Sequence, residues 1–536
     1  MNGQSHCSKE ATPFNGDGQE RLDFTAFIGQ LESMKNLKRI LIANRGEIAV
    51  RIIKTVKKMG LTSIVVYSDA DRNSLAVKMA DESIHIGGSS PSQSYLNIPA
   101  IVEACLKTGA DAVHPGYGFL SENESFARAL EENGIVFIGP TPETISAMGN
   151  KIEARRIMEA HGVPVVPGNN DLPSDPAAIA SIASEIGYPL LVKARAGGGG
   201  RGMRLIQSEK ELMDGIQSAR REAASAFADD GVFLEKFVET PRHIEIQIFG
   251  DGQGNCIHLF ERECSIQRRH QKIIEESPSP ALGPSERASI TEAALKAGRA
   301  VNYRGAGTVE FVYSDSTRSF YFLEMNTRLQ VEHPVTEEVT GRDLVRDQIL
   351  VAMDPSHLPD QREITQKGHS MEVRLYAEDP SEGFIPSAGK IHRFKTPSSL
   401  RVDTGVESGS EVSLFYDPMI AKIIATGSKR AETIANLRQG LDDVVLFGPR
   451  SNLEYLKSIL ENPQFQSGDF STAFIEKEMS DWKPTTSEST LERARAALAV
   501  LYYEGAGKRN RARTGVWASD SFQLWQKSLA AEKTRA

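Results

Sequence analysis

The regular pattern begins with an apolar run at 39–43, followed by a turn at 44–47. A stretch with helical periodicity at 48–59 and a second apolar run at 63–67 come next. Apolar runs joined by helical periodicity are typical of strands linked by crossover helices. We therefore expect a parallel sheet with helices on its faces over residues 36–148. A dinucleotide fingerprint needs spaced glycines at the first turn, and only Gly46 is present there. The pattern thus predicts a Rossmann-like domain that does not bind NAD.

From Gly149 onward the pattern changes to alternation of apolar and polar residues. A helix is predicted at 151–161 and a strand at 189–194. Four alternating runs follow, at 243–250, 255–263, 308–314 and 319–326. Period-two alternation on both sides of a short turn predicts antiparallel hairpins. We expect the first two runs to pair with each other, the last two to pair likewise, and residues 149–354 to form one domain.

The rest of the chain divides into a mixed segment and two terminal extensions. Residues 369–480 combine predicted strands and helices, at 371–378, 419–427, 432–442 and 452–462. Residues 1–35 are polar and are expected to be disordered. The tail 484–536 holds a predicted helix at 491–503 and a basic stretch at 507–515. Charge runs of this kind are usually solvated faces.

Composition narrows the class of protein. At 536 residues the chain is too long for one core, so roughly two to four domains are expected. Its 62 basic and 71 acidic residues give a net charge of −9, which argues against a general nucleic-acid binder. No apolar run approaches the about 18 residues of a membrane helix.

Cysteine spacing and the N-terminal segment bear on the compartment. The cysteines lack metal-ligand spacing and are expected to be reduced thiols, at Cys7, Cys105, Cys256 and Cys264. The first 35 residues contain acidic side chains and lack the apolar core of a secretory signal. We therefore expect a cytoplasmic protein.

A glycine-rich loop offers the first candidate chemistry. Gly197–Gly200 and Gly202 would let backbone N–H groups approach a polyphosphate closely. Lys193 lies in the strand just before the loop, where it could meet phosphates. By itself, a glycine run is more often a flexible turn, so the phosphate interpretation needs independent support.

Polar residues within two apolar strands form the second candidate site. Glu310 lies in one strand of the predicted second hairpin, and Glu324 and Asn326 share a face of the other. Three oxygen ligands gathered there suit Mg²⁺ that bridges phosphates. The alternative is that these residues form ordinary salt bridges, but unpaired carboxylates are costly to bury in apolar strands.

Two polar segments complete the set. If the alternation of side chains continues beyond Asn326, then Arg328, Gln330 and Glu332 lie on the same face of the strand as Asn326. Together an arginine, an amide and a carboxylate can bind a small oxyanion and take its proton. The run RRHQK at 268–272 is, considered alone, best interpreted as a surface loop.

Together these segments resemble a known family, the biotin carboxylases, which are ATP-grasp enzymes. The resemblance rests on the strand lysine Lys193, the glycine loop, RRHQK and EMNTRLQVEHPVTE (324–337), in this order. The motifs NRGEIAVRI (44–52), HPGYGFLSEN (114–123) and YDPMIAK (416–422) agree with it. It covers Lys38 to Met479, and RRHQK and NTRLQVEHP are its most specific parts.

The resemblance implies an α/β, ATP-grasp fold with a Rossmann-like N-terminal domain, a mobile lid at roughly 165–240 and a mixed α/β C-terminal part. It implies ATP contacts at Lys151, Lys193, Gly198, Gly199, Gly200, Met203, Glu235, Lys236, Val238, His243 and Gln267. It implies two Mg²⁺ or Mn²⁺ ions at Glu310, Glu324 and Asn326, and bicarbonate at Lys272, Arg328, Gln330, Glu332 and the backbone N–H of Val331. Glu332 would be the general base, and Arg374 would face the biotin ureido oxygen.

The implied activity is ATP- and bicarbonate-dependent carboxylation of biotin through carboxyphosphate, as the first half-reaction of an acyl-CoA carboxylase. The family's biotinylation motif Met-Lys-Met is absent, and the nearest match is AVKM at 76–79. Biotin is therefore expected on a separate carrier protein or domain, with a carboxyltransferase subunit as a further partner and a homodimer or larger complex as the assembly. Residues 484–536 weakly resemble the start of a linker domain.

Several alternatives stay open on the sequence. Another ATP-grasp ligase would explain the glycine loop and the acidic strands, but not RRHQK or NTRLQVEHP. A scaffold without activity would have lost Glu332, Lys272 or a metal glutamate, and all are present. The final carboxyl acceptor is undetermined, as is whether the chain stands alone or is part of a longer α subunit.

Overall fold

The computed structural model of the protein describes residues 37–170, 172–195, 203–227, 229–269, 271–484, 495–496 and 499–500. The chain divides into two compact units, Met1–Asp481 and Trp482–Ala536, and every helix and strand named below belongs to the first. The expected disorder of residues 1–35 and the expected phosphate contacts of Gly198, Gly199 and Gly200 lie outside the described residues. So does most of the tail helix expected at 491–503.

The N-terminal part is a five-stranded parallel sheet, as the pattern predicted. Its strands follow the order β3-β2-β1-β4-β5, with β1 at Arg39–Ile42, β2 at Thr62–Ser68, β3 at Glu82–Gly87, β4 at Ala112–His114 and β5 at Val136–Phe137. The intervening helices are α2 (Gly46–Lys58), α3 (Leu75–Met79), α4 (Ile98–Thr108), α5 (Glu124–Glu132) and α6 (Pro142–Gly149). Helix α2 buries its apolar face, and it carries Glu47 in its first turn and Lys57 and Lys58 in its last, which complements the helix dipole.

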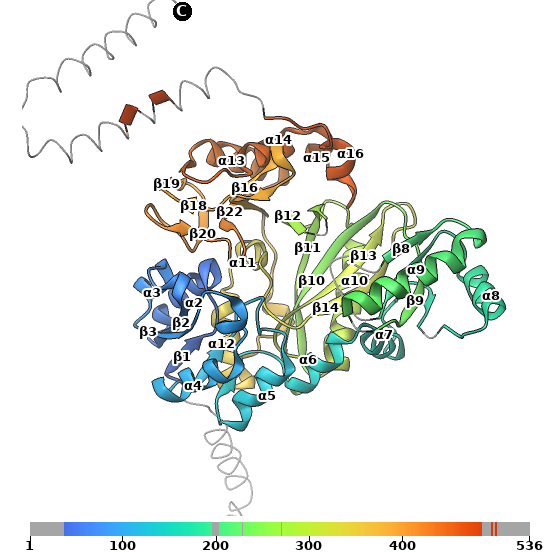
Figure 1. Cartoon of the computed structure of the whole chain (residues 1–536), viewed down its shortest axis with the longest axis horizontal. Coiled ribbons are helices and arrows are strands. Elements are labelled where there is room, and N and C mark those ends of the chain that lie inside the picture. Colours follow the sequence, from blue (N-terminus) through green and yellow to red (C-terminus); the bar gives the residue numbers. More distant parts are fainter. Residues whose placement is uncertain are drawn as a thin grey trace, which may run out of the picture. The chain divides into compact units, whose positions relative to one another are not determined.

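An eight-stranded antiparallel sheet forms the centre of this unit (Figure 1). Its order is β14-β13-β10-β11-β12-β15-β22-β20, and the strands are β10 (Pro241–Asp251), β11 (Cys256–Arg268), β12 (Gln271–Ser277), β13 (Arg304–Ser314), β14 (Ser319–Asn326), β15 (His369–Tyr376), β20 (Arg401–Thr404) and β22 (Met419–Gly427). Both predicted hairpins are confirmed, β10 with β11 and β13 with β14. Strands from both expected segments, 149–354 and 369–480, share this sheet.

The central sheet is tied to the N-terminal part by a close backbone contact. A Cβ atom at Gly405, directly after β20, would lie 2.3 Å from the carbonyl carbon of Gly46. Only glycine permits that approach, which places the end of β20 against the start of α2.

The segment expected as the lid has a sheet and a core of its own. Its strands follow the order β6-β9-β7-β8, with β6 at Gly168–Asn169, β7 at Leu190–Ala194, β8 at Met203–Ile206 and β9 at Val232–Lys236. Helices α8 (Pro176–Ile186) and α9 (Glu209–Phe227) pack on it. Buried Leu190, Val192 and Leu234 form part of a separate hydrophobic cluster. The mobility of this lid stays a prediction.

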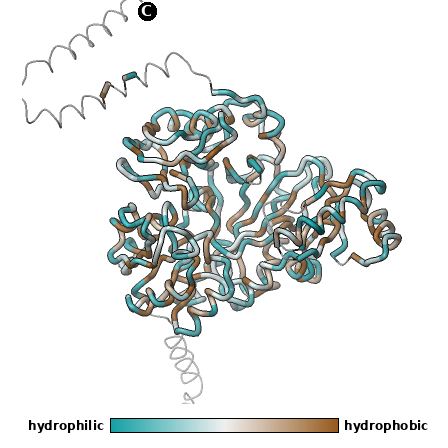
Figure 2. The backbone as a smooth tube through the Cα atoms, viewed as in Figure 1, coloured by the Kyte–Doolittle hydropathy of each residue, from teal (hydrophilic) through white to brown (hydrophobic). Residues whose placement is uncertain are grey.

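The remaining elements surround the two larger sheets. The helices are α7 (Lys151–Ala160), α10 (Pro284–Ala300), α11 (His333–Thr340), α12 (Leu344–Met353), α13 (Arg430–Asp442), α14 (Leu453–Glu461), α15 (Pro463–Ser467) and α16 (Phe474–Glu478). Short strands pair as β16 (Glu378–Asp379) with β17 (Ile385–Pro386), β18 (Gly389–Lys390) with β21 (Glu411–Val412) and β19 (Arg393–Lys395) with β23 (Val445–Phe447). Hydrophobic positions run along the strands and the helix faces turned toward them (Figure 2). No helix in the described residues is long and apolar enough to span a membrane.

Candidate active site

Lys272 lies at the centre of a buried group of carboxylates. From β12, its Nζ donates to Glu245 Oε2 at 2.5 Å, to Glu310 Oε1 at 2.9 Å and to Glu332 Oε1 at 2.6 Å. Burial would lower the pKa of Lys272, but the three carboxylates raise it well above its ordinary value. The lysine is therefore a fixed positive charge. The interpretation of 268–272 as a surface loop is wrong for its ends, because β11 extends to Arg268 and β12 begins at Gln271, and the Lys272 side chain is buried among carboxylates.

Glu332 stands directly before α11 and is shared by two cations. Its Oε1 accepts from Lys272, and its Oε2 accepts from Arg374 Nη2 at 3.0 Å. Burial would raise the pKa of Glu332, but Lys272, Arg374 and Arg262 together hold it well below its ordinary value. The carboxyl is thus ionised and can accept a proton.

The predicted oxyanion residues come together, but not on a strand. Strand β14 ends at Asn326, so the alternation expected from 326 to 332 is wrong as a description of the backbone. Hydrogen bonds assemble the group instead. Arg328 donates to Asn326 Oδ1 at 3.1 Å and to Gln330 Oε1 at 2.8 Å, and Gln330 Nε2 donates to Glu310 Oε1 at 3.1 Å. The carbonyl of Val331 accepts from Lys422 Nζ at 2.8 Å, while the role expected of its N–H stays a prediction.

The expected metal ligands lie on the β13–β14 hairpin. Glu310 and Glu324 are opposite each other in the strand register, and Asn326 Nδ2 donates to Glu310 Oε1 at 2.8 Å. Burial and the nearby charge of Glu310 raise the pKa of Glu324, whose Oε2 lies 3.7 Å from Lys151 Nζ. Two carboxyls that repel each other here would both be stabilised in their ionised form by a divalent cation. The donor set therefore fits Mg²⁺ or Mn²⁺.

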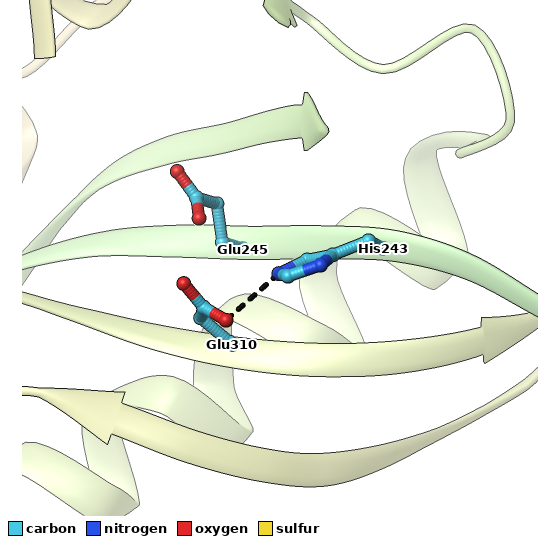
Figure 3. Close-up of side chains that lie close together, drawn as sticks. All are labelled: His243, Glu245 and Glu310. Atoms are coloured by element: carbon cyan, nitrogen blue, oxygen red, sulfur yellow. Dashed lines mark ion pairs between the residues drawn. The ribbon is translucent and has the colours of Figure 1, made fainter. Parts of the chain in front are cut away.

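A second donor set borders the first and was missed from the sequence. His243 Nε2 lies 2.9 Å from Glu310 Oε2. Together with Glu245 these residues offer ligand atoms within 4.8 Å of one another (Figure 3). Both His243 and Glu245 come from β10, and the carboxyl of Glu245 points to the same side of the sheet as that of Glu310 (Figure 3). The histidine expected near the nucleotide thus contacts an expected metal ligand.

Several residues expected to bind ATP lie on the sheet of the lid. Lys193 on β7 forms an ion pair with Glu235 on β9, and Arg155 on α7 lies 2.9 Å from the same carboxylate. Lys236 donates to the carbonyls of Gly187 and Tyr188 at 2.9 and 2.8 Å. Met203 pairs with Lys193 across β7 and β8. Val238 follows β9 within the lid. Outside the lid, Gln267 pairs with Lys272 across β11 and β12, and Lys151 begins α7.

Comparison with known proteins decides the family. Models of the biotin carboxylase N-terminal domain, of the carbamoyl-phosphate synthase L chain ATP binding domain and of the biotin carboxylase C-terminal domain match residues 36–145, 150–359 and 372–477. The chain belongs to the biotin carboxylase family. A biotin carboxylase structure from Campylobacter jejuni is 45% identical, with a TM-score of 0.79, and the match covers 83% of this chain and 99% of that one.

Other relatives are longer than this chain. The methylcrotonoyl-CoA carboxylase subunit alpha of Mus musculus is 49% identical over 473 residues, which are 88% of this chain and 66% of that protein. The propionyl-CoA carboxylase alpha chain of Ruegeria pomeroyi is 46% identical over 88% of this chain and 73% of that one. The biotin carboxylase domain of the Hydrogenobacter thermophilus 2-oxoglutarate carboxylase, solved with MgADP and bicarbonate, is 42% identical, with a TM-score of 0.79, over 84% of this chain and 100% of that one.

Some side chains of this biotin carboxylase site carried no role in the sequence argument. Glu122, within HPGYGFLSEN, accepts from Arg328 Nε at 2.8 Å. Glu275 on β12 accepts from Arg374 Nε at 2.6 Å. Glu245 had a usable signal, because His243, Glu245 and Gln247 alternate with isoleucines along β10. For Glu122 and Glu275, the partner arginine lies far away in the sequence, so no local pattern reveals the contact.

Proposed function

We propose that this biotin carboxylase uses ATP to join bicarbonate to biotin through carboxyphosphate. The observation that carries the proposal is the chain of contacts from Lys272 through Glu332 to Arg374. It links a fixed positive charge, an ionised carboxylate and a buried guanidinium within one site. Another ATP-grasp ligase would share the nucleotide residues but has no need of this chain.

In the first half-reaction Glu332 takes the proton of bicarbonate. The bicarbonate oxygen attacks the γ-phosphorus of ATP, the bond to ADP breaks, and carboxyphosphate and ADP form. Lys272 and Arg328 bind the anion, and Gln330 orients it through its amide. Mg²⁺ or Mn²⁺ held by Glu310, Glu324 and Asn326 would neutralise charge on the phosphates. Lys193 and Lys151 supply further positive charge for the same phosphates.

In the second half-reaction carboxyphosphate divides into CO₂ and phosphate. The phosphate takes the proton of the biotin ureido nitrogen, and that nitrogen attacks CO₂. Arg374 stabilises the enolate oxygen that forms, because its guanidinium is a permanent charge in a buried setting. Exclusion of water by the lid at 165–240 would protect both intermediates.

The relatives suggest the wider reaction. Because the chain spans 66% of the mouse methylcrotonoyl-CoA carboxylase subunit alpha, we extend the proposal to a carrier of biotin, a separate carboxyltransferase and an acyl-CoA as the final acceptor. An oligomer is supported by the Hydrogenobacter structure, which is named a domain dimer. The expected cytoplasmic location is not confirmed, since the mouse relative is named mitochondrial.

The test measures carboxybiotin and phosphate separately. Purified protein is incubated with ATP, Mg²⁺, radiolabelled bicarbonate and free biotin, and acid-labile label on biotin is counted. We expect ATP hydrolysis only with bicarbonate and a divalent cation, and faster hydrolysis with biotin. ATP turnover that is equal in bicarbonate-depleted buffer would contradict the proposal.

A further inference from the structure

Arg374 is held by two carboxylates that come from different parts of the chain. Its Nη2 lies 3.0 Å from Glu332 Oε2, and its Nε donates to Glu275 Oε1 at 2.6 Å. Glu275 stands on β12, next to β15, which carries Arg374. The side chains of Glu275 and Glu332 are 0% and 1% exposed, so the guanidinium has little water to replace either partner.

One of these two partners loses its charge during the reaction. In the proposed function, on which this inference rests, Glu332 is neutralised when it takes the proton of bicarbonate. A buried guanidinium without a charged partner is strongly destabilised. Glu275 is the carboxylate that remains on Arg374 at that moment, and it takes no part in the proton transfer.

We propose that Glu275 is a positioning residue, which keeps Arg374 paired and directed at biotin while Glu332 carries the proton. Arg374 touches the substrate, and Glu275 acts through it. Glu275 Oε1 lies 2.6 Å from both Nε and Nη2 of Arg374, so it holds the same edge of the guanidinium that meets Glu332 and keeps that edge in place when Glu332 is protonated. A single counter-ion at Glu332 would let the side chain reorient each time the base is protonated.

The surroundings of Glu275 support this role. Glu275 Oε2 is buried and has no hydrogen-bond partner within the described residues, and the same holds for both carboxyl oxygens of Glu372. Glu372 is opposite Glu275 in the register of β12 and β15. Burial raises the pKa of Glu372 well above its ordinary value, against the charge of Lys422, which disfavours a second charged carboxylate beside Glu275.

The groups that face Glu275 also predict a dependence on pH. They are Lys272 on its own strand, Arg374 and Glu372 on β15, and Glu332 before α11. Burial raises the pKa of Glu275 to about 7, although the charge of Arg374 opposes the rise. Below that pH the carboxyl becomes neutral and holds Arg374 less firmly.

The experiment compares wild type, Glu275→Gln and Glu372→Gln. Glu275→Gln keeps the shape and the acceptor oxygen but removes the charge. Glu372→Gln makes the same change at the opposite position of the neighbouring strand, where the carboxyl has no hydrogen bond to Arg374, and is the matched control. The readouts are carboxybiotin formation, bicarbonate-dependent ATP hydrolysis without biotin, the KM for biotin and thermal unfolding. We expect the ratio of the biotin-dependent to the biotin-free rate to fall about ten-fold in Glu275→Gln, with a higher KM for biotin, and to stay at the wild-type value in Glu372→Gln.

The pH profile separates positioning from general support of the fold. The wild-type ratio should fall toward that of Glu275→Gln as the pH drops through about 7, and the ratio of the variant should be flat. The proposal is overturned if the ratio of the biotin-dependent to the biotin-free rate in Glu275→Gln equals that of wild type. It is also overturned if this ratio falls equally in Glu275→Gln and Glu372→Gln and both variants unfold at lower temperatures. If Glu275→Gln does not fold, a flat ratio in wild type between pH 6 and 8 overturns it. Wild-type protein that forms no carboxybiotin refutes the proposed function, and this inference with it.

Discussion

Arg374 Nη2 lies 3.0 Å from Glu332 Oε2, so the residues assigned to the two halves of the reaction form one ion pair. Each therefore sets the state of the other. Arg374 helps to hold the pKa of Glu332 below its ordinary value, although burial acts in the opposite direction. Loss of either side chain should affect both chemical steps, but in different ways.

Glu332→Gln should stop the first step. The amide keeps the shape of the side chain but cannot take the proton of bicarbonate. We expect bicarbonate-dependent ATP hydrolysis to fall by roughly 10²–10⁴-fold, the usual effect of losing a general base. Phosphate release without biotin is the direct measurement, and hydrolysis within two-fold of wild type would contradict the assignment of the base.

Arg374→Ala should act mainly on the second step and should also change the pH profile of the first. We expect the ratio of carboxybiotin to ATP hydrolysed to fall by roughly 10²-fold or more, as for the loss of a preorganised oxyanion partner. Without Arg374 the pKa of Glu332 rises, so the acid limb of ATP hydrolysis should move to higher pH. A limb that stays in place would show that the two side chains do not interact in the working enzyme.

Lys272→Met should reduce stability as well as activity. The change removes the charge shared by Glu245, Glu310 and Glu332, and buried carboxylates left without a cation cost on the order of 3–5 kcal/mol. Denaturation in urea at pH 7 measures the effect. Lys78→Met is the control, because Lys78 pairs with Glu407 on the surface and should change stability by about 1 kcal/mol or less. Similar losses in both variants would contradict the structural role of Lys272.

The hairpins could be predicted because alternation and turn residues are local signals. Strands β10, β11, β13 and β14 each show period two in their own sequence, so their pairing followed directly. The site could be predicted only in part. The segment after Asn326 gathers its side chains through hydrogen bonds to one another, which no periodicity encodes. The contact of Arg374 with Glu275 depends on the register between β12 and β15, strands that are far apart in the sequence.

Tyr416→Phe should lower the free energy of unfolding. The Tyr416 hydroxyl contacts Ser68 Oγ at 2.6 Å and donates to the carbonyl of Ser89 at 2.5 Å, and so ties the segment YDPMIAK to the N-terminal sheet. The Arg45 guanidinium lies 4.2 Å from the ring centroid, a contact that phenylalanine keeps. We expect the free energy of unfolding to fall by about 1–2 kcal/mol, the usual cost of losing such hydrogen bonds. Urea denaturation measures the effect, and an unchanged free energy of unfolding would refute this expectation.

Glu378→Gln should change how stability depends on pH. Glu378 Oε2 accepts from Arg268 Nη2 at 3.0 Å, and its side chain is 7% exposed. Burial raises the pKa of Glu378 to about 7, with Arg268 opposing the rise and Asp417 adding to it. In the unfolded chain a glutamate has a pKa of about 4.3. Between these values the folded protein holds a proton that the unfolded chain has released, so the free energy of unfolding falls as the pH rises.

Glutamine cannot ionise, so this pH-dependent decrease in the free energy of unfolding is absent from Glu378→Gln. The stability of Glu378→Gln relative to wild type should therefore increase from pH 5 to pH 8, by on the order of 1–3 kcal/mol. Urea denaturation at several pH values gives the difference directly, and Glu382→Gln, an exposed change in the next turn, serves as the control. A difference between Glu378→Gln and wild type that stays constant across this range would mean that Glu378 is ionised in the folded protein at pH 5, with Arg268 as its full counter-ion.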